Sequence, residues 1–383
     1  MKPIPYGKHT ITEEDIDSVV EVLRSDFLTQ GPKIPEFENS FAEFCGARYA
    51  AAVSNGTAAL HLCALALDVK PGDVVVTTPI TFVASANGFR YCGAEIKFCD
   101  IDPVTKLMDL DKLEEILSED QTGRIKGVVV VDFAGYPVNT EKLRSIADRY
   151  GLWIVEDACH APGAYFIDSK GEKIKCGNGK YADLTVFSFH PVKHIAACEG
   201  GMITTNNAGL YEKITRLRTH GITKNNELLS KNDGGWYYEM VDLGYNYRIT
   251  DIQAALGLSQ LGRIKANLDR RNAVAQIYND GFKENENITI GNISKDIFHA
   301  YHLYIIEVKE RKELYDYLHA NGVLAQIHYI PAHLMPYYRR LGWSEGDFPN
   351  AERYYQQCLS LPMFPSLTEE ELKYVIKKVL KFY

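Results

Sequence analysis

The chain has 383 residues, long enough for two domains, and its 24% charged and 46% hydrophobic residues are ordinary for a soluble globular protein. The net charge of −8 argues against a general nucleic-acid or membrane-surface binder, and no apolar run is long enough to span a bilayer. The eight cysteines have no metal-binding spacing and no signal peptide opens the chain, so we expect free thiols, no metal and a cytoplasmic location.

Helices and strands alternate through the first half of the chain. A capping-box pattern, Thr12-Glu-Glu-Asp15, predicts a helix to about residue 24, and a second helix is predicted over 35–45. Apolar runs predict strands at 49–53, 74–77, 95–99, 127–131, 152–156 and 184–189, with helices near 58–67, 84–92, 110–117 and 140–150. Such strands, apolar on both faces, predict a mostly parallel sheet covered by helices, which binds ligands beyond the carboxyl ends of its strands.

The second half predicts a smaller unit. Residues 223–242 are polar and predict a loop, and 252–275 carry a long helical pattern that links two domains. A strand from 298, a helix at 312–321, a strand at 323–329, a helix near 351–359 and a last helix from the capping box Thr368-Glu-Glu-Glu371 predict an α+β domain. We therefore divide the chain into a large domain, residues 1–250 with the N-terminal segment, and residues 251–383, the linking helix with a small C-terminal domain.

Lys193 is the candidate catalytic residue. It lies on a turn after the apolar strand at 184–189, and two glycines, at 200 and 201, and then a second strand-like run follow it. Desolvation there lowers the pKa of the lysine and favours the neutral amine, the nucleophile that forms an imine. On this stretch alone, a strand-end lysine that extends into solvent is an equally acceptable interpretation.

Thr57 and Asp157 also lie just past predicted strand ends. Thr57 follows Gly56 in a tight turn before a helix, where free N–H groups form an anion site, and Asp157 ends an apolar strand and needs a cationic partner. Taken singly, an ordinary helix cap explains either residue. Jointly, a phosphate at Thr57 and Ser188, a ring nitrogen at Asp157 and an aldehyde at Lys193 are what pyridoxal 5′-phosphate requires.

Two further side chains are candidates to contact this cofactor. Phe82 and His160 could cover the faces of the ring or its phenolic oxygen. Without the other residues, a core aromatic and a hydrogen-bonded histidine at a strand end would be the preferred interpretations.

Six motifs in order resemble the DegT/DnrJ/EryC1/StrS sugar aminotransferases, which are fold-type-I pyridoxal enzymes. The resemblance covers nearly the whole chain and is carried by Ser54-Asn-Gly-Thr-Ala-Ala-Leu60, Thr78-Pro-Ile-Thr-Phe82, Val155-Glu-Asp-Ala-Cys-His160, Phe187-Ser-Phe-His-Pro-Val-Lys-His194, Glu199-Gly-Gly201 and Gly244-Tyr-Asn-Tyr-Arg-Ile-Thr-Asp-Ile-Gln-Ala-Ala255. It implies an α/β fold with a seven-stranded sheet in the large domain. It also implies that Lys193 forms the Schiff base, that Asp157 pairs with the pyridinium, and that Asn246 reaches the phosphate in a neighbouring subunit of a homodimer.

A narrower resemblance is to the branch of this family that serves pseudaminic acid biosynthesis. Gly322-Val-Leu-Ala-Gln-Ile-His-Tyr329, Tyr6 and Leu28-Thr-Gln-Gly31 carry it, whereas Ile195-Ala-Ala-Cys198 departs from the usual threonines and serines. It implies transfer of an amino group from L-glutamate to C4 of a UDP-linked 4-keto-6-deoxy N-acetylhexosamine. The sugar-nucleotide residues would be Tyr6, Asp26, Phe27, Leu28, Thr29, Gln326, Ile327, His328 and Tyr329. Arg248 is a candidate for the glutamate carboxylate, with an interface arginine as the alternative.

Three alternatives follow from the same residues. An aminotransferase for another keto sugar nucleotide, of the UDP-bacillosamine, perosamine or dTDP-sugar type, would carry the same motifs. A sugar dehydratase on this scaffold would have histidine where Lys193 stands. A cofactor-binding regulator is disfavoured because no helix-turn-helix segment or basic arm is evident.

Overall fold

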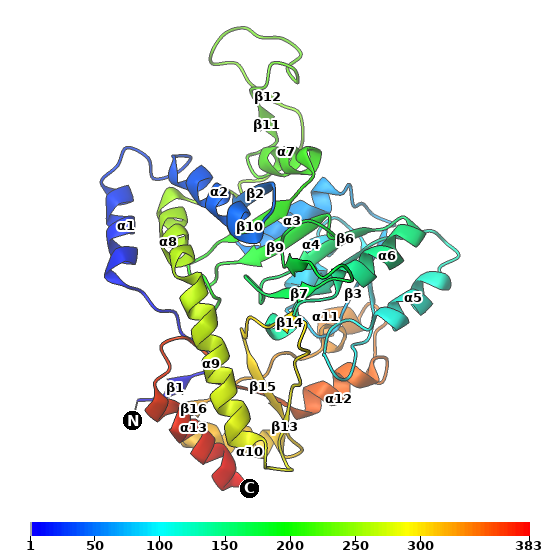
Figure 1. Ribbon diagram of the computed structural model, residues 1–383. Coiled ribbons are helices and arrows are strands. Elements are labelled where there is room, and N and C mark those ends of the chain that lie inside the picture. The colour runs from blue at the N-terminus through cyan, green and yellow to red at the C-terminus, as the bar shows by residue number, and fades with distance from the viewer. Residues whose placement is uncertain (1) are drawn as a thin grey trace.

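A seven-stranded sheet forms the centre of the protein in a computed structural model that describes residues 2–383 (Figure 1). The strand order is β2-β10-β9-β6-β5-β3-β4, and only β10 runs antiparallel to its neighbours. The mostly parallel seven-stranded sheet expected from the sequence is therefore confirmed. Its strands are β2 (Tyr49–Val53), β3 (Val74–Thr77), β4 (Glu95–Phe98), β5 (Ile125–Val131), β6 (Trp153–Asp157), β9 (Leu184–Ser188) and β10 (Gly201–Thr205).

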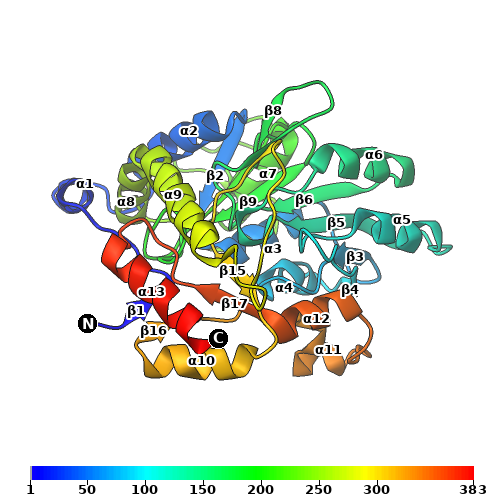
Figure 2. The same cartoon turned by 60° about the horizontal axis from the view of Figure 1, so that its bottom comes forward.

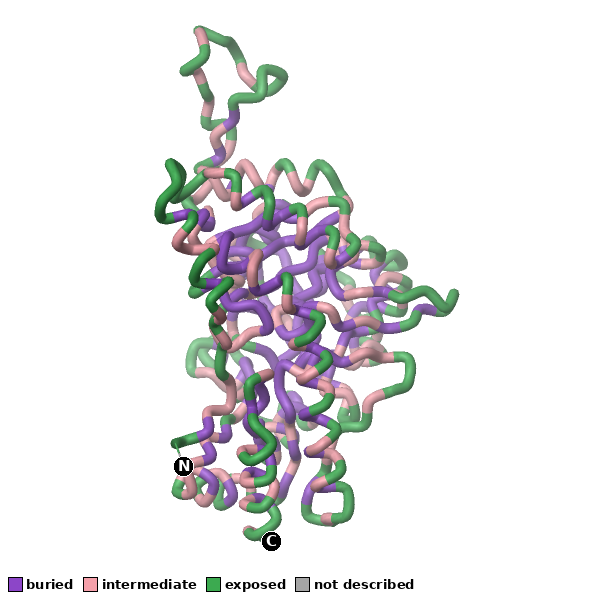
Figure 3. Tube along the Cα trace, turned by 60° about the vertical axis from the view of Figure 1, so that its left-hand side comes forward, coloured by how far each residue is buried: buried purple, intermediate pink, exposed green. Residues whose placement is uncertain are grey.

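Each face of the sheet packs against helices because alternate strand residues are apolar on both sides. One face, with Ala52, Phe187 and Met202, packs with α2 and α8, and the other, with Val53 and Val186, packs with α3. The helices of this layer structure are α1 (Glu13–Leu23), α2 (Lys33–Cys45), α3 (Gly56–Ala66), α4 (Ala84–Arg90), α5 (Leu110–Ser118), α6 (Thr140–Tyr150), α7 (Ala208–Leu217) and α8 (Asp251–Gly262). The buried residues of this part of the chain form two clusters, which lie toward the middle of the molecule (Figure 3).

The C-terminal region builds a second core around a three-stranded antiparallel sheet, β13 (Thr289–Ile290), β15 (Tyr304–Glu307) and β17 (Cys358–Leu361). The long helix α9 (Ile264–Phe282) contributes Leu268 to the first core and Tyr278 to the second. Helices α10 (Arg311–Ala320) and α13 (Glu369–Phe382) cover the small sheet together with α9 (Figure 2). Helices α11 (Pro336–Arg339) and α12 (Pro349–Gln357) lie beside α4 and β4 in the same view.

The N-terminal segment joins this second core. Strand β1 (Ile4–Pro5) pairs in parallel with β16 (Val323–Leu324), and Ile4 is buried among the side chains of the small sheet. The division of the chain at 250/251 stays a prediction, although α8 begins there, at the capping box of Thr250 and Gln253.

Three sequence-based expectations differ from the structure in the second half of the chain. The pattern at 252–275 is two helices separated at Arg263, whose side chain pairs with buried Asp15. The strand expected at 323–329 ends at Leu324, beyond which only Gln326 forms a bridge, with Ser360. The helix expected to 359 ends at Gln357, because the next four buried residues pair with β15 as a strand, a long-range contact that outweighs local helical preference.

Smaller elements complete the fold. Strands β7 (Tyr165–Ile167), β8 (Lys173–Lys175) and β14 (Ile297–Phe298) form a sheet that the sequence did not suggest. The polar segment expected to be a loop contains a short hairpin, β11 (Ile222–Thr223) with β12 (Glu239–Met240), whose connecting loop projects away from the core at the top of Figure 1. Within residues 2–383, no helix combines the length and the apolar character needed to cross a membrane.

Candidate active site

A cavity of about 1000 Å³ lies beyond the carboxyl ends of β2, β6 and β9, which all run in the same direction. This is the place where open α/β sheets bind ligands. The last residues of β6 and β9, Asp157 and Ser188, line it, together with the first turn of α3 and the turn that carries Lys193. The loop after β16 closes another side with His328 and Tyr329.

The amine of Lys193 is desolvated at the edge of this cavity. Burial lowers its pKa to about 8, and the nearby carboxylate of Asp157 partly offsets that effect. Its Nζ lies 3.3 Å from Nε2 of His302. The amine is therefore largely neutral at mildly alkaline pH, as a nucleophile that attacks an aldehyde must be.

Asp157 is a buried carboxylate that neutral groups hold in place. The hydroxyl of Ser85 donates to Oδ2 at 2.6 Å, and the backbone N–H of Cys159 donates to Oδ1 at 3.2 Å. No lysine or arginine of residues 2–383 forms an ion pair with it. A buried carboxylate normally has a cationic partner. A protonated pyridine ring in the cavity would supply the positive charge that Asp157 lacks.

The first turn of α3 provides an anion site opposite Asp157. Asn55 caps the helix by accepting a hydrogen bond from the N–H of Ala58 at 2.8 Å. The N–H groups of Gly56 and Thr57 come before the first intrahelical donor and are directed along the positive end of the helix dipole. Ser188 adds a hydroxyl, and a Cβ at Gly56 would lie 3.1 Å from its Cβ, so the cradle is narrow.

We expect Gly201→Ala to weaken cofactor binding about tenfold or more. Gly201 pairs with both Val53 and Ser188, and a Cβ there would lie 2.7 Å from the carbonyl of Asn55, which must move and displace the turn at Gly56. Titration of the cofactor-free protein with pyridoxal 5′-phosphate measures the change. Gly209→Ala is the matched control, because a Cβ at Gly209 would meet only Oδ1 of Asn207, at an acceptable distance of 3.4 Å. Equal affinities in the two variants would show that the turn is not a phosphate site.

His160 has a defined neutral tautomer. Burial and the nearby positive charge of Lys193 keep its pKa well below the usual value. Nδ1 accepts a hydrogen bond from the N–H of Ala134 at 3.2 Å, so Nε2 carries the proton and donates to the hydroxyl of Tyr329, also at 3.2 Å. Phe82, by contrast, is 58% exposed at the cavity mouth, with its ring 6.2 Å from that of Tyr329.

The structure brings together ten of the residues predicted from the sequence. Those that line the cavity are Tyr6, Gly56, Thr57, Phe82, Asp157, His160, Ser188, Lys193, His328 and Tyr329. The others lie outside its lining: Asp26, Phe27, Leu28, Thr29, Asn246, Arg248, Gln326 and Ile327. Asn246 is exposed and bridges to Thr219, and Thr29 bridges to Thr250. The roles of all eighteen residues stay predictions.

The sequence did not suggest several residues of the site. Ser85 holds Asp157, Tyr247 lines the cavity and bonds His61, and His302 contacts Lys193. Ser85 comes one turn after Thr81 at the start of a helix, a weak signal for a polar contact. His302 is 109 positions from Lys193, and no local pattern links the two.

The comparisons with known proteins agree with this geometry. Residues 9–380 match the DegT/DnrJ/EryC1/StrS aminotransferase family. Spore coat polysaccharide biosynthesis protein SpsC of Bacillus subtilis is 38% identical over 98% of this chain and 96% of its own length. The UDP-4-amino-4,6-dideoxy-N-acetyl-beta-L-altrosamine transaminase of Campylobacter jejuni is 35% identical over 99% of both chains.

Solved structures support the same assignment. The PMP form of the sugar aminotransferase Spr1654 of Streptococcus pneumoniae aligns with a TM-score of 0.90 at 30% identity, covering 98% of both chains, and a PLP form of it aligns with 0.89. PseC of Helicobacter pylori, an aminotransferase of pseudaminic acid biosynthesis, aligns with 0.88 at 32% identity over 99% of both chains. The fold-type-I architecture and the cofactor expected from the sequence agree with these structures. This chain belongs to the DegT/DnrJ/EryC1/StrS aminotransferase family.

Proposed function

We propose that this protein is a pyridoxal 5′-phosphate-dependent aminotransferase that moves the amino group of L-glutamate to a nucleotide-linked 4-keto-6-deoxy sugar. The proposed product is UDP-4-amino-4,6-dideoxy-N-acetyl-β-L-altrosamine, the compound in the name of the Campylobacter jejuni relative. One observation carries the proposal: a desolvated lysine, a buried carboxylate without a cationic partner and the N-terminus of α3 surround one cavity.

Each residue around the cavity has a distinct task in this proposal. Bound pyridoxal phosphate supplies an electron sink for the carbanion formed at Cα of the donor. Lys193, with its pKa near 8, removes the proton from Cα of glutamate and acts as the general base and then the general acid. Asp157 stabilises a positive ring nitrogen, and Thr57 and Ser188 hold the phosphate. The neutral Nε2–H of His160 orients Tyr329 on the substrate side.

The remaining wall of the cavity is the proposed sugar site. It is lined by Tyr6, His328 and Tyr329. The ring centroids of Tyr6 and His328 lie 5.1 Å apart. A volume of about 1000 Å³ lies at the upper end of the range for small-ligand sites, so it can hold a cofactor and part of a sugar nucleotide together. Asp26 to Thr29, Arg248, Gln326 and Ile327 are proposed substrate contacts that extend beyond this lining.

A panel of keto sugar nucleotides tests the substrate. With L-glutamate, we expect the UDP-linked 4-keto-6-deoxy N-acetylhexosamine to be aminated at C4, with NMR of the product as the measurement and the GDP- and dTDP-linked 4-keto sugars as comparisons. The similarity to SpsC, a spore coat polysaccharide protein, favours a second candidate, another keto sugar of a surface polysaccharide. Preferred amination of a comparison sugar would support that candidate and contradict the first.

We further propose that the active unit is a homodimer with shared sites. Asn246 lies outside the cavity of its own subunit, and the preceding segment 236–243 exposes large apolar side chains, with Trp236 75% and Leu243 78% exposed. Large apolar side chains left exposed in one segment favour a contact with a second subunit.

We expect Leu243→Asp to shift the protein from dimer to monomer in analytical ultracentrifugation, because a charge would be buried in the contact. Lys193→Ala and Asn246→Asp subunits should each be inactive, and their co-expression should restore part of the activity. If each site were complete within one subunit, co-expression would not restore activity, or the Asn246→Asp protein would already be active by itself. Either result would contradict the shared site.

We propose a cytoplasmic location, because all eight cysteines are unpaired thiols, as in a reducing compartment. Fractionation of the native cells would test it, and recovery outside the cytoplasm would contradict it.

A further inference from the structure

His302 makes the hydrogen-bond contact of the Lys193 side chain. It lies in the segment between β14 and β15, and its Nε2 is 3.3 Å from Nζ. Within residues 2–383, no other hydrogen-bond or ion-pair partner is found for this amine. The histidine is 4% exposed, so the contact is shielded from water. A lysine side chain with four flexible carbons is thus tied at its end to a single group.

The backbone on either side of His302 is fixed. Nη1 of buried Arg271 donates to the carbonyl of Tyr301 at 2.9 Å and, more weakly, to that of His302 at 3.4 Å. The N–H of Leu303 donates to the carbonyl of Ala134 at 3.2 Å, in the same loop whose N–H fixes His160. The imidazole therefore meets Lys193 from a position that the small sheet and the large sheet define together.

The surroundings of His302 keep its ring neutral. Its ring centroid lies 4.3 Å from that of His160 and 5.7 Å from that of His194. Burial, Lys193, these histidines and Arg271 all oppose a positive charge, so the pKa of His302 is well below its usual value. Nδ1 is buried without a partner. Buried polar atoms are almost always paired, so this orphan atom needs an explanation.

A neutral imidazole has one donor and one acceptor nitrogen. An ammonium at Lys193 can only donate, so Nε2 must accept from it and the proton of the ring must sit on Nδ1. The ring therefore leaves Nδ1–H without an acceptor, which is unfavourable, so that the lone pair of Nε2 can accept from the lysine. The other tautomer would leave Nδ1 as an unpaired acceptor, and its Nε2–H could not accept a hydrogen bond from the ammonium.

We propose that His302 is a positioning residue for Lys193: its Nε2 accepts a hydrogen bond from the ε-amine whenever that amine is free and holds Nζ at the cavity edge. The inference rests on the proposed function, in which Lys193 must return repeatedly to the same place to move a proton. The groups that face the amine from the neighbouring elements are Asp157, Cys159, His160, His194, His302 and His328. Of these, only His302 makes the bond.

The test compares His302→Leu and His302→Gln with His299→Leu. His299 is buried in the same segment and accepts from the N–H of Tyr301 at 2.8 Å, without a hydrogen bond to Lys193. The full chain is freed of cofactor, and acylation of Lys193 is followed against pH by mass spectrometry. Loss of the acceptor destabilises the ammonium, so His302→Leu should lower the labelling midpoint by about one pH unit. His302→Gln should shift it less, and His299→Leu should leave it unchanged.

The second measurement is the single-turnover rate with L-glutamate in the cofactor-loaded protein, which we expect to be about tenfold lower for His302→Leu than for His302→Gln. If His302→Leu does not fold, His302→Asn replaces it, because asparagine places its amide near Nδ1 and glutamine near Nε2. Equal midpoints for His302→Leu (or its replacement) and the wild type, or an equal shift in His299→Leu, would overturn the proposal. If no variant or wild-type protein binds cofactor at Lys193, the proposed function fails, whereas the labelling midpoints still test His302.

Discussion

Lys193→Ala is expected to lower kcat for transamination by at least about a thousandfold. The variant loses both the nucleophile and the acid–base group, and positioned acid–base groups alone contribute about 10²–10⁴-fold. Steady-state rates with glutamate and a keto sugar nucleotide measure the loss. Borohydride reduction of the loaded wild-type protein should attach the cofactor to the peptide that contains Lys193.

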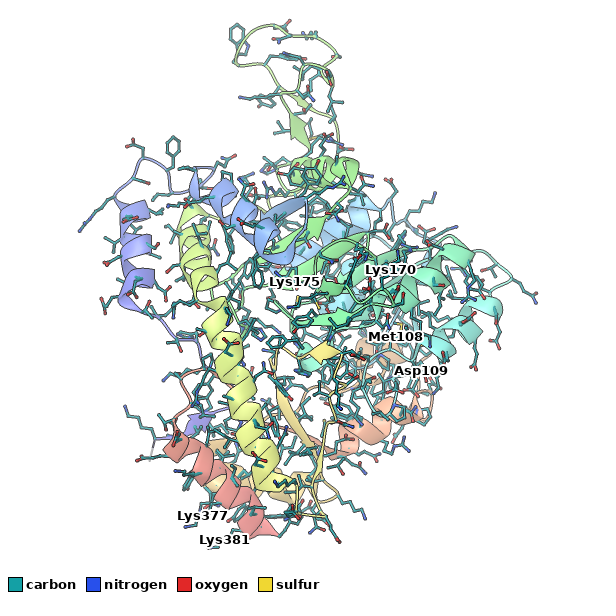
Figure 4. All side chains as sticks on the ribbon, viewed as in Figure 1. Met108, Asp109, Lys170, Lys175, Lys377 and Lys381 are labelled. Atoms are coloured by element: carbon teal, nitrogen blue, oxygen red, sulfur yellow. The ribbon has the colours of Figure 1, made fainter. Side chains whose placement is uncertain are left out.

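Lys377→Ala is the matched control, because this lysine is exposed on α13 (Figure 4) and does not line the cavity. It should keep wild-type activity and the same reduced adduct. Near-normal turnover of Lys193→Ala, or an adduct on another lysine, would refute the assignment. The free amine should also capture cofactor faster as pH rises through about 8, because protonated lysine cannot attack an aldehyde.

Asp157→Asn is expected to lower kcat about a hundredfold or more, with folding preserved. The oxygen of the asparagine can accept from the N–H of Cys159 and its NH2 group can donate to the hydroxyl of Ser85, but the side chain carries no charge to stabilise a protonated ring nitrogen. Single-turnover absorbance with L-glutamate measures the step directly, and circular dichroism checks the fold. A variant with an unchanged single-turnover rate would show that the ring nitrogen has no partner at this carboxylate.

Asp132→Asn is the control for Asp157→Asn, because Asp132 is also a buried acid at the end of a neighbouring strand. Burial and the nearby carboxylate of Glu156 hold its pKa well above the usual value, so the site disfavours a charge on this side chain. Oδ1 accepts from the N–H of Val138 at 2.8 Å, and asparagine preserves that bond. We expect activity within about threefold of the wild type.

Stability gives this control a second readout. The folded pKa of Asp132 exceeds the unfolded value near 3.9, so the native state binds the additional proton between the two. Wild-type stability should therefore fall as pH rises through that interval, and Asp132→Asn should weaken this dependence, while the raised pKa of buried Glu156 keeps part of it. Because ligand atoms of Asp132, Glu156 and Cys176 lie within 4.8 Å of one another, stabilisation of the wild type by added Zn²⁺ would instead indicate a cation in place of the proton.

The parts of the site that follow local apolar runs could be predicted from the sequence. Asp157 ends β6, and Thr57 and Lys193 follow within five residues of the ends of β2 and β9, so strands that run in the same direction bring all three to one edge. The central strands were predicted to within about two residues for the same reason, because burial on both faces leaves an uninterrupted hydrophobic signal.

The contacts that depend on distant parts of the chain could not be predicted. His302 reaches Lys193 only because α9 and the small sheet return the chain to the cavity, and Arg271 is buried against backbone carbonyls rather than acids. The sequence extends the predicted helix into the first two residues of β17, Cys358 and Leu359, because the pairing of this strand with β15, 51 or more positions away, has no local signature. Asn246 and Arg248 lie outside the lining of the cavity, so the geometry of a single chain does not link them to the predicted site.

The pairing of β1 with β16 has a practical consequence for handling the protein. Tyr6, which lines the cavity, follows that two-residue strand immediately. Deletion of residues 2–5 would remove the strand pairing that holds Tyr6 in the cavity wall, although no proposed catalytic residue would be deleted.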